Sequence, residues 1–339
     1  MKTSVHITID TESAMGGAWE APENGPLPAS RHVFCRDGSA AYGIPLIVDE
    51  LGRFGFQATF FCEMLATPVL GEADTRSVVD ALLAADQDVQ LHVHPVYWYY
   101  RRFLDGGAAD RDHYRASAND LLCEHPPDRQ LALLEEACDL FRTCAGRVPV
   151  AFRAGNFAAS RATLRALGKL GFVIDSSYNP AQHQDPSFTD DPPEPNMVQS
   201  IEGVWEFPVT VASTRIREGN GYKPFDPVAL CVWEMQRILE TAHAAGMPHV
   251  TLLFHCFSFV KPRDMSYHRF RPNRIVIARL RALLAFLDVN RSRFRVETFG
   301  ALAAAGSIRA SDVTIIPDLG FWRPATRKAM QVVNRLYWL

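Results

Sequence analysis

The amino-acid sequence predicts an α/β fold: a single (β/α) barrel with helices outside and long loops at the carboxyl ends of the strands. Short apolar runs alternate with longer helical patterns almost throughout, which is typical of a parallel sheet covered by helices. The long connections follow strands, so a barrel gathers them on the face where active sites lie. The chain has 339 residues, a length that one α/β barrel commonly reaches.

The individual elements are expected from local patterns. The first segment, SVHITID, shows the alternation of a strand, and Gly55 and Gly146 each follow a helical pattern as stop signals. Strands are expected at 4–10, 57–62, 88–94, 148–155, 172–178, 204–210, 249–257 and 294–300. Helices are expected at 41–55, 76–86, 128–146, 160–171, 226–246 and 274–290. We therefore expect residues 1–305 to form the barrel and 306–339 a C-terminal extension with an amphipathic helix.

Composition limits the classes of protein to which the chain can belong. The net charge of −3 argues against a nucleic-acid binder, which normally carries a strong basic excess. The sequence has neither the apolar core of a signal peptide near its start nor an apolar run long enough to span a membrane. Its seven cysteines lack C-x-x-C spacing, which favours free thiols in a reducing compartment. We expect a cytoplasmic protein.

Polar side chains gather at the ends of five predicted strands. Residues i and i+2 of a strand point to the same side, so two of these ends present a pair of carboxylates and a pair of imidazoles. Each residue alone has an ordinary structural explanation, but five coinciding strand ends indicate a functional site. The residues concerned are Asp10, Glu12, His92, His94, Arg153, Asn156, Asp175, Tyr178 and His255.

These motifs resemble those of the polysaccharide deacetylase family, also called the NodB-homology family or carbohydrate esterase family four. The resemblance covers nearly the whole chain and follows the order of the family's motifs. It implies the irregular seven-stranded barrel of that family. The matching segments are TIDTE (8–12), QATFF (57–61), LHVHP (91–95), FRAGN (152–156), DSSY (175–178) and LFH (253–255).

The resemblance also implies a divalent metal ion, most often zinc, held by one carboxylate and two histidines. Asp10 matches the catalytic base, while Thr11 stands where the family has its metal-binding aspartate. Glu12 faces the same way as Asp10, so Glu12 takes the role of the ligand, or the two carboxylates exchange roles. His92 and His94 match the two histidine ligands.

The remaining motif residues imply a hydrolytic mechanism. Arg153 would orient the base, and Asp175 would hold and tune His255, the acid that protonates the leaving amine. The implied reaction removes an N-acyl group, most often acetyl, from an amino sugar. Two alternatives remain open: an allantoinase-like amidohydrolase acting on a small non-sugar amide, and a carbohydrate-binding protein that has lost catalysis with the aspartate at position 11.

Substrate contacts are expected in the long loops. Without an export signal, a member of this family would act on a nucleotide- or lipid-linked amino sugar, a precursor of surface polysaccharide. Arg269 and Arg271, in the basic loop 261–274, would bind its phosphate, although an ordinary solvated loop has the same composition. Further candidates for substrate binding are Trp19, Tyr97, Trp98, Asn156 and Tyr178, of which the aromatic residues would otherwise pack beneath the loops.

The C-terminal stretch 320–339 mixes basic and aromatic residues outside the resemblance. Such a tail can lie on an anionic membrane surface, pack on its own barrel or join two subunits in a homo-oligomer.

Overall fold

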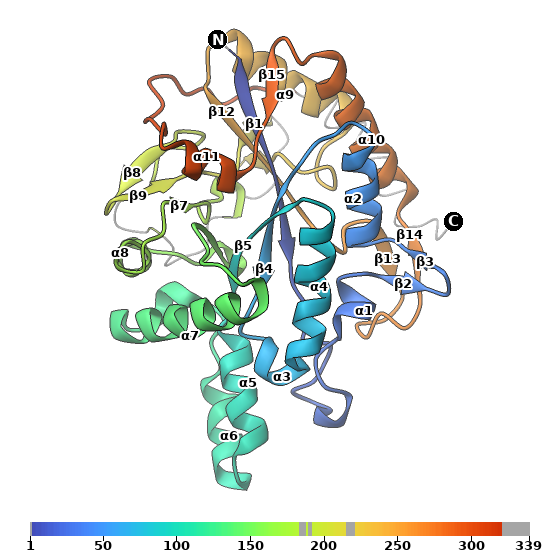
Figure 1. Cartoon of the computed structure of the whole chain (residues 1–339), viewed down its shortest axis with the longest axis vertical. Coiled ribbons are helices and arrows are strands. Elements are labelled where there is room, and N and C mark those ends of the chain that lie inside the picture. Colours follow the sequence, from blue (N-terminus) through green and yellow to red (C-terminus); the bar gives the residue numbers. More distant parts are fainter. Residues whose placement is uncertain (1, 183–187, 189–191, 215–220, 321–339) are drawn as a thin grey trace.

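The computed structural model describes residues 2–182, 188, 192–214 and 221–320 (Figure 1). Its centre is a nine-stranded sheet in the order β12-β1-β4-β5-β6-β7-β9-β8, with β15 paired to the start of β1. The seven strands from β12 to β9 run parallel, and β8 alone is antiparallel to its neighbour. The strands are β1 (Thr3–Thr11), β4 (Thr59–Glu63), β5 (Asp88–Val93), β6 (Ala151–Ala154), β7 (Ile174–Asp175), β8 (Gln199–Ile201), β9 (Val204–Glu206), β12 (His249–His255) and β15 (Phe294–Val296).

The sheet curls into a half-barrel, and an irregular segment bridges its open side. The backbone N–H of Thr210, beyond β9, donates to the carbonyl of Thr251 in β12 at 3.0 Å. The N–H of Thr251 donates in turn to Oγ1 of Thr210 at 2.9 Å. The predicted (β/α) barrel class is thereby confirmed, with an irregular closure in place of a regular strand pair.

Helices lie on the outer side of the sheet and at its ends (Figure 1). They are α1 (Ala29–His32), α2 (Ile44–Gly52), α3 (Thr67–Leu70), α4 (Glu72–Ala84), α5 (Val96–Asp105), α6 (Ala108–Ser117), α7 (Pro127–Ala145), α8 (Arg161–Lys169), α9 (Val232–Ala244), α10 (Arg274–Val289) and α11 (Phe299–Ala305). Short 3-10 turns lie at Pro22–Asn24, Leu122–Glu124, Gly155–Phe157 and Pro180–Gln182. Three hairpins complete the fold: β2 (Arg36–Asp37) with β3 (Ala40–Ala41), β10 (Val211–Ser213) with β11 (Tyr222–Pro224), and β13 (Val260–Pro262) with β14 (Phe270–Pro272).

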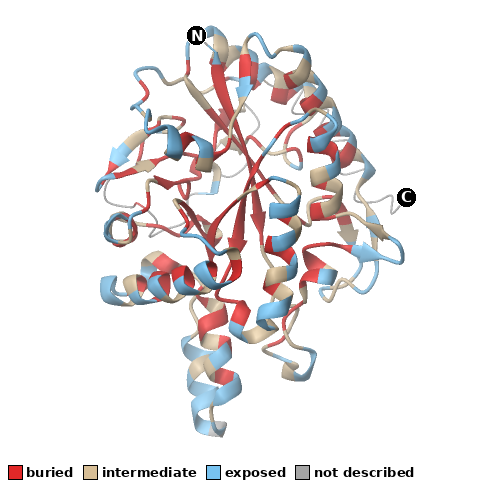
Figure 2. Cartoon of the chain, viewed as in Figure 1, coloured by how far each residue is buried: buried red, intermediate tan, exposed pale blue. Residues whose placement is uncertain are grey.

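All six predicted helices are present, but α5 and α6 were expected to be loop. They project beyond the carboxyl ends of the strands, and Figure 2 shows α6 largely exposed. Because α5 begins at Val96, immediately after β5, this projection stands beside the strand end that carries the two predicted histidine ligands.

Two apolar layers hold β1 in place, and all nine of its residues are buried. Val5, Ile7 and Ile9 belong to the large apolar core that includes side chains of the outer helices. The alternate positions point to the inside of the barrel, as strand geometry requires. There the His6 ring packs edge-on against Phe207 and at a tilt against Phe299, with ring centroids 5.5 and 4.9 Å apart.

The C-terminal extension returns to the barrel in its described part. The N–H of Ser213 donates to the carbonyl of Pro317, and the N–H of Leu319 donates to the carbonyl of Ser213. The amphipathic helix expected near the C-terminus falls on 321–339, outside the described residues, and the domain boundary at 305/306 stays a prediction. Among the helices of the described ranges, none has the length and apolar character needed to cross a bilayer.

Candidate metal centre

Strand register brings the predicted site residues to one end of the barrel. Asp10 is the neighbour of His255 across the β1–β12 pair, and His92 is the neighbour of Arg153 across the β5–β6 pair. Because the strands are parallel, all of these residues lie near the carboxyl ends, where barrel loops converge.

Glu12, His92 and His94 form the candidate metal centre. Oε2 of Glu12 lies 2.9 Å from Nε2 of His92 and 2.7 Å from Nε2 of His94. One atom from each residue falls within 4.8 Å of the others, and within the described residues no second such group of three is found. Two imidazole nitrogens and one carboxylate oxygen are the donor set of open catalytic zinc sites.

The far side of each imidazole is held by an acceptor. Nδ1 of His92 donates to the carbonyl of Arg153 at 2.7 Å, and Nδ1 of His94 lies 2.7 Å from Oδ2 of Asp120. With a proton on each Nδ1, both Nε2 lone pairs point toward the same carboxylate oxygen. The carboxylate oxygen and the two nitrogen lone pairs would repel one another at these distances, so protons or a metal ion must lie between them.

The electrostatic environment keeps Glu12 ionised. Burial raises the pKa of Glu12, but the adjacent His94 and the hydrogen bonds from both histidines outweigh it and hold that pKa well below its ordinary range. Burial lowers the pKa of His94, and the carboxylates of Asp120 and Glu12 outweigh that effect and raise it well above the ordinary value. Glu12 is therefore a carboxylate ready to bind a cation.

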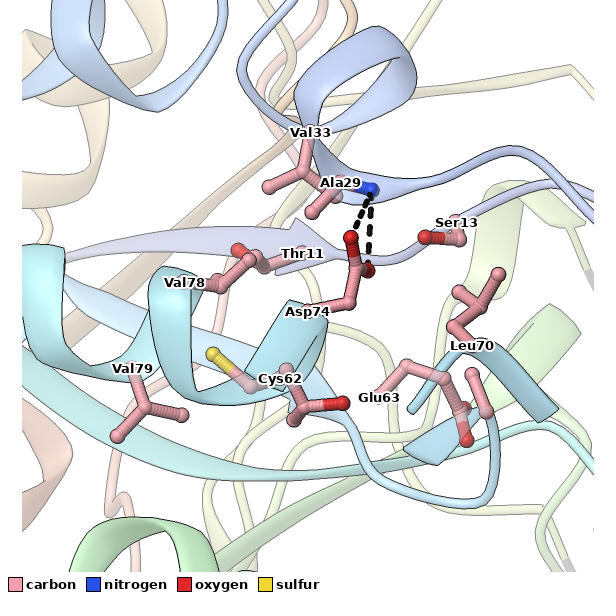
Figure 3. Close-up of a pocket in the computed structure, with 12 residues that line it drawn as sticks. Thr11, Ser13, Ala29, Val33, Cys62, Glu63, Leu70, Asp74, Val78 and Val79 are labelled. Atoms are coloured by element: carbon pink, nitrogen blue, oxygen red, sulfur yellow. Dashed lines mark hydrogen bonds between the residues drawn. The ribbon is translucent and has the colours of Figure 1, made fainter. Parts of the chain in front are cut away.

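Thr11 points away from this centre. It lines a small pocket together with Cys62, Val78 and Val79, and Figure 3 shows them between the sheet and α4. Strand alternation separates Thr11 from Asp10 and Glu12, which face the inside of the barrel. The geometry thus favours Glu12, two residues from Asp10, as the carboxylate ligand, and Thr11 faces the wrong side of the strand for that role.

Asp10 is fixed by Arg153. Nη1 of Arg153 donates to Oδ1 of Asp10 at 2.7 Å, and the side chains are 0% and 3% exposed. The other guanidinium hydrogens go to Oγ1 of Thr8 and to the carbonyl and hydroxyl of Ser176. Oδ2 of Asp10 remains directed toward His255, whose Nε2 lies 3.9 Å away.

Among the described residues no hydrogen bond or ion pair joins Asp175 to His255, so the predicted acid–orienter pair stays a prediction without a direct contact to support it. It accepts a hydrogen bond from Oγ of Ser177 at 2.6 Å and pairs with Glu206. Burial and the Asp175 charge raise the pKa of Glu206 well above its ordinary value. Oδ2 of Asp175 and Oε2 of Glu206 have no other partner among the described residues, which fits two carboxyl groups that share one proton.

Asp226 was not predicted as a site residue. In the structure its carboxyl group interacts electrostatically with His255. Burial raises the pKa of the Asp226 carboxyl to about 6, and the nearby His255 lowers it in part. From sequence, the Asp-Pro pair at 226–227 gave only the start of a helix, and α9 in fact begins at Val232. The approach of Asp226 to His255 depends on the fold and has no local sequence signal.

The predicted aromatic contacts are largely internal. Arg102 and Arg129 cover Trp98, with guanidinium carbons 3.3 and 3.7 Å from the ring centroid, and its 7% exposure leaves little of the ring for a sugar. Tyr97 is buried at 1% exposure, and Trp19 packs edge-on against Tyr100. These three residues stabilise the α5 region, and the predicted contact of Tyr97, Trp98 and Trp19 with substrate finds no support in their packing.

The other predicted substrate residues are distributed differently. Asn156 donates from Nδ2 to Oδ2 of Asp120 at 2.7 Å, and its amide is therefore engaged within the protein. Tyr178 is buried at 7% exposure. Arg269 and Arg271 are exposed on the β13–β14 hairpin.

His32 is a further site residue that the sequence did not indicate. Its Nδ1 donates to the backbone carbonyl of Glu12 at 2.8 Å. Its ring centroid lies 4.3 Å from that of Phe257 and 4.6 Å from that of Tyr267. The Phe257 ring is in turn 5.0 Å from His255. These rings form one wall beside the candidate centre.

Comparison with known proteins identifies the fold. No family model and no curated protein sequence matches the chain. A Mycobacterium smegmatis protein, provisionally described as a polysaccharide deacetylase, aligns over 93% of this chain and 94% of its own, with a TM-score of 0.52 and 16% identity. A family 4 carbohydrate esterase from Streptomyces lividans, in complex with acetate, gives a TM-score of 0.41 at 11% identity, over 87% of this chain and 91% of its own. A CE4 family pseudoenzyme from Bacillus anthracis gives 0.43 at 10% identity, over 88% and 64%. The chain thus shares the fold of the Mycobacterium smegmatis protein.

Proposed function

We propose that this chain is a metal-dependent hydrolase of the polysaccharide deacetylase family that removes an N-acyl group, acetyl in the first instance, from an amino sugar. The observation that carries the proposal is the convergence of Glu12, His92 and His94 beside the Asp10–Arg153 pair. His255 completes the arrangement, within 3.9 Å of both carboxylates.

The residues present fit a zinc ion. Glu12, His92 and His94 would hold it, and acceptors on each Nδ1 leave both Nε2 atoms available as ligands. When bound, zinc supplies a Lewis acid that polarises the acyl carbonyl and lowers the pKa of a water molecule.

Two residues of the chain then act as proton acceptor and proton donor. Asp10 accepts a proton from the attacking water at Oδ2, because Arg153 occupies Oδ1. The water oxygen bonds to the acyl carbon, the C–N bond breaks, and His255 donates a proton to the departing nitrogen. The products are a carboxylic acid, acetate for an acetyl group, and the free amino sugar.

The first experiment measures acetate release from N-acetylated amino sugars before and after chelation of metal. We expect release that chelation abolishes and added zinc restores. Ammonia or a ring-opened product from a small cyclic amide, in place of acetate, would assign the allantoinase-like alternative. Zinc binding without turnover on either class would favour the carbohydrate-binding alternative.

We further propose that the substrate carries a phosphate or diphosphate, as in a nucleotide- or lipid-linked precursor. Lys261 is the cross-strand partner of Arg271, and the N–H of Arg263 donates to the carbonyl of Arg269. Cross-strand partners share a face, so this hairpin gathers four basic side chains on one side. Tyr267, in its turn, packs on His32 beside Glu12, which brings the hairpin to the site. A cytoplasmic location stays a prediction from the sequence.

The substrate proposal is tested by replacing Arg269 and Arg271 with alanine. The KM for a nucleotide-diphosphate-linked N-acetylamino sugar should rise, and activity on a neutral chitin-like oligomer should be almost unchanged. Arg142→Ala is the matched control, because this exposed arginine forms a local ion pair with Asp139 on α7. Equal losses on both substrates, or a wild-type preference for the neutral oligomer, would contradict the proposal and indicate that the hairpin is an ordinary solvated loop.

A further inference from the structure

Asp120 lies directly behind the candidate ligand His94. Its Oδ2 is 2.7 Å from Nδ1 of His94 and accepts a second hydrogen bond, also at 2.7 Å, from Nδ2 of Asn156. Its Oδ1 accepts the backbone N–H of Val96 at 3.0 Å. Three donors from two separate segments, 94–96 and the turn at 155–157, therefore fix the direction of this carboxylate.

The FRAGN turn supports the same ring from another side. A Cβ atom at Gly155 would lie 2.5 Å from Cε1 and Nδ1 of His94, so only glycine permits this approach. Asn156 and Phe157 both adopt left-handed backbone conformations, with φ of 54° and 57°. Such conformations are costly for residues other than glycine and persist where the surrounding structure requires them.

The two candidate ligands differ in how they are held. His92 donates to a backbone carbonyl, whereas His94 faces a carboxylate. A hydrogen bond to a carboxylate is roughly twice as strong as one between neutral groups. It also increases the basicity of the opposite ring nitrogen, which is the one that binds metal.

We propose that Asp120 is a positioning residue of the metal centre. It keeps the proton of His94 on Nδ1, leaves Nε2 free to bind the metal and fixes the ring plane, with Asn156 and Gly155 completing the support. Asn156, expected from sequence to bind substrate, then acts through Asp120. This inference rests on the proposed metal-dependent function.

The test measures zinc affinity of the full chain by competition with a chromophoric chelator, and the visible absorption spectrum of the cobalt-substituted protein. Asp120→Asn should weaken zinc binding by about 10- to 100-fold and change the cobalt spectrum, since His94 is reoriented. Asn156→Ala should act in the same direction by a smaller factor. Gly155→Ala, which displaces His94 sterically, provides a variant that leaves Asp120 intact. Circular dichroism checks that each variant is folded.

Asp74→Asn is the matched control. The backbone N–H of Ala29 donates to both oxygens of this carboxylate, at 3.2 Å to Oδ1 and 3.0 Å to Oδ2. Asp74 lines the pocket of Figure 3 together with Thr11, which points away from the metal centre. The control variant should bind zinc as the wild type does. Wild-type affinity and spectrum in folded Asp120→Asn would overturn the positioning role and leave the proposed function standing. A wild-type chain that binds no zinc would instead overturn the proposed function itself, and the positioning role with it.

Discussion

Arg153 donates a hydrogen bond to Asp10 at 2.7 Å inside the barrel, where both side chains are buried. The pair joins β6 to β1, and the bond engages Oδ1 of Asp10 while Oδ2 faces His255. A carboxylate with one oxygen held and the other directed to the site is positioned to accept a proton, as the proposed function requires of Asp10. This relationship separates the role of Asp10 from that of Glu12, which contacts the histidines.

Asp10 and Glu12 should therefore respond differently to neutralisation. Asp10→Asn should abolish turnover and retain bound zinc, because the amide cannot accept the proton of water. Glu12→Gln should weaken zinc binding, because an amide oxygen is a poorer ligand than a carboxylate. Zinc titration and acetate release, measured on both variants, check this. Loss of metal from Asp10→Asn and retention by Glu12→Gln would show that the two roles are exchanged.

His255→Ala should lower kcat by about 10²- to 10⁴-fold, the usual contribution of a positioned acid or base. Zinc content should be unchanged, since His255 is outside the three-residue metal group. Asp175→Asn should cost less, because Asp175 bonds to Ser177 and Glu206 and makes no hydrogen bond or ion pair with His255 among the described residues. Activity of His255→Ala within a few-fold of wild type would mean that another group protonates the amine.

Protein stability should depend on pH through His6. Nε2 of His6 lies 3.0 Å from Nδ1 of His249, and burial together with His249 lowers the pKa of His6 to about 3. Between that pH and an unfolded-state pKa of about 6.5, the unfolded chain binds more protons than the folded one. The free energy of unfolding should thus be fully retained above pH 6.5 and fall as the pH decreases toward 3.

Urea unfolding at pH 7, 6, 5 and 4 measures this dependence, with a limit of about 1.4 kcal/mol per pH unit for one histidine. His6→Gln should flatten the curve below pH 6.5, because the amide does not titrate. A variant with the same pH dependence as wild type would assign the acid sensitivity to other groups.

The strands and the main site residues could be predicted because their signals are local. The expected strand at 4–10 is β1 at Thr3–Thr11, and its alternation already placed Asp10 and Glu12 on one face. The helix α5 was not predicted, because it begins two residues after His94 and its aromatic residues were interpreted as substrate contacts in a loop. The buried positions of α5 are 97, 98, 100 and 103, and the spacing of 97, 100 and 103 is that of a helix.

Asp120 and Asp226 show where sequence reasoning stopped. Each is a single carboxylate in a connection between elements, and each gains its role from residues distant in the chain: Asp120 is 26 residues from His94. No spacing rule links such positions, because the loops that carry them are placed by packing against the barrel. Arg153, which holds Asp10, could be predicted from its motif, whereas Asp120 and Asp226 were identified only in the structure.

The central claim is that Glu12, His92 and His94 bind one metal ion, and metal content after zinc loading and desalting tests it most directly. Wild type should retain about one zinc per chain, as an open three-ligand site implies, and His92→Ala should retain almost none. His113→Ala is the control, because His113 is an exposed histidine on α6 and lies outside the three-residue group. It should keep the wild-type content. A wild-type chain without zinc, or equal zinc in His92→Ala and wild type, would contradict the account.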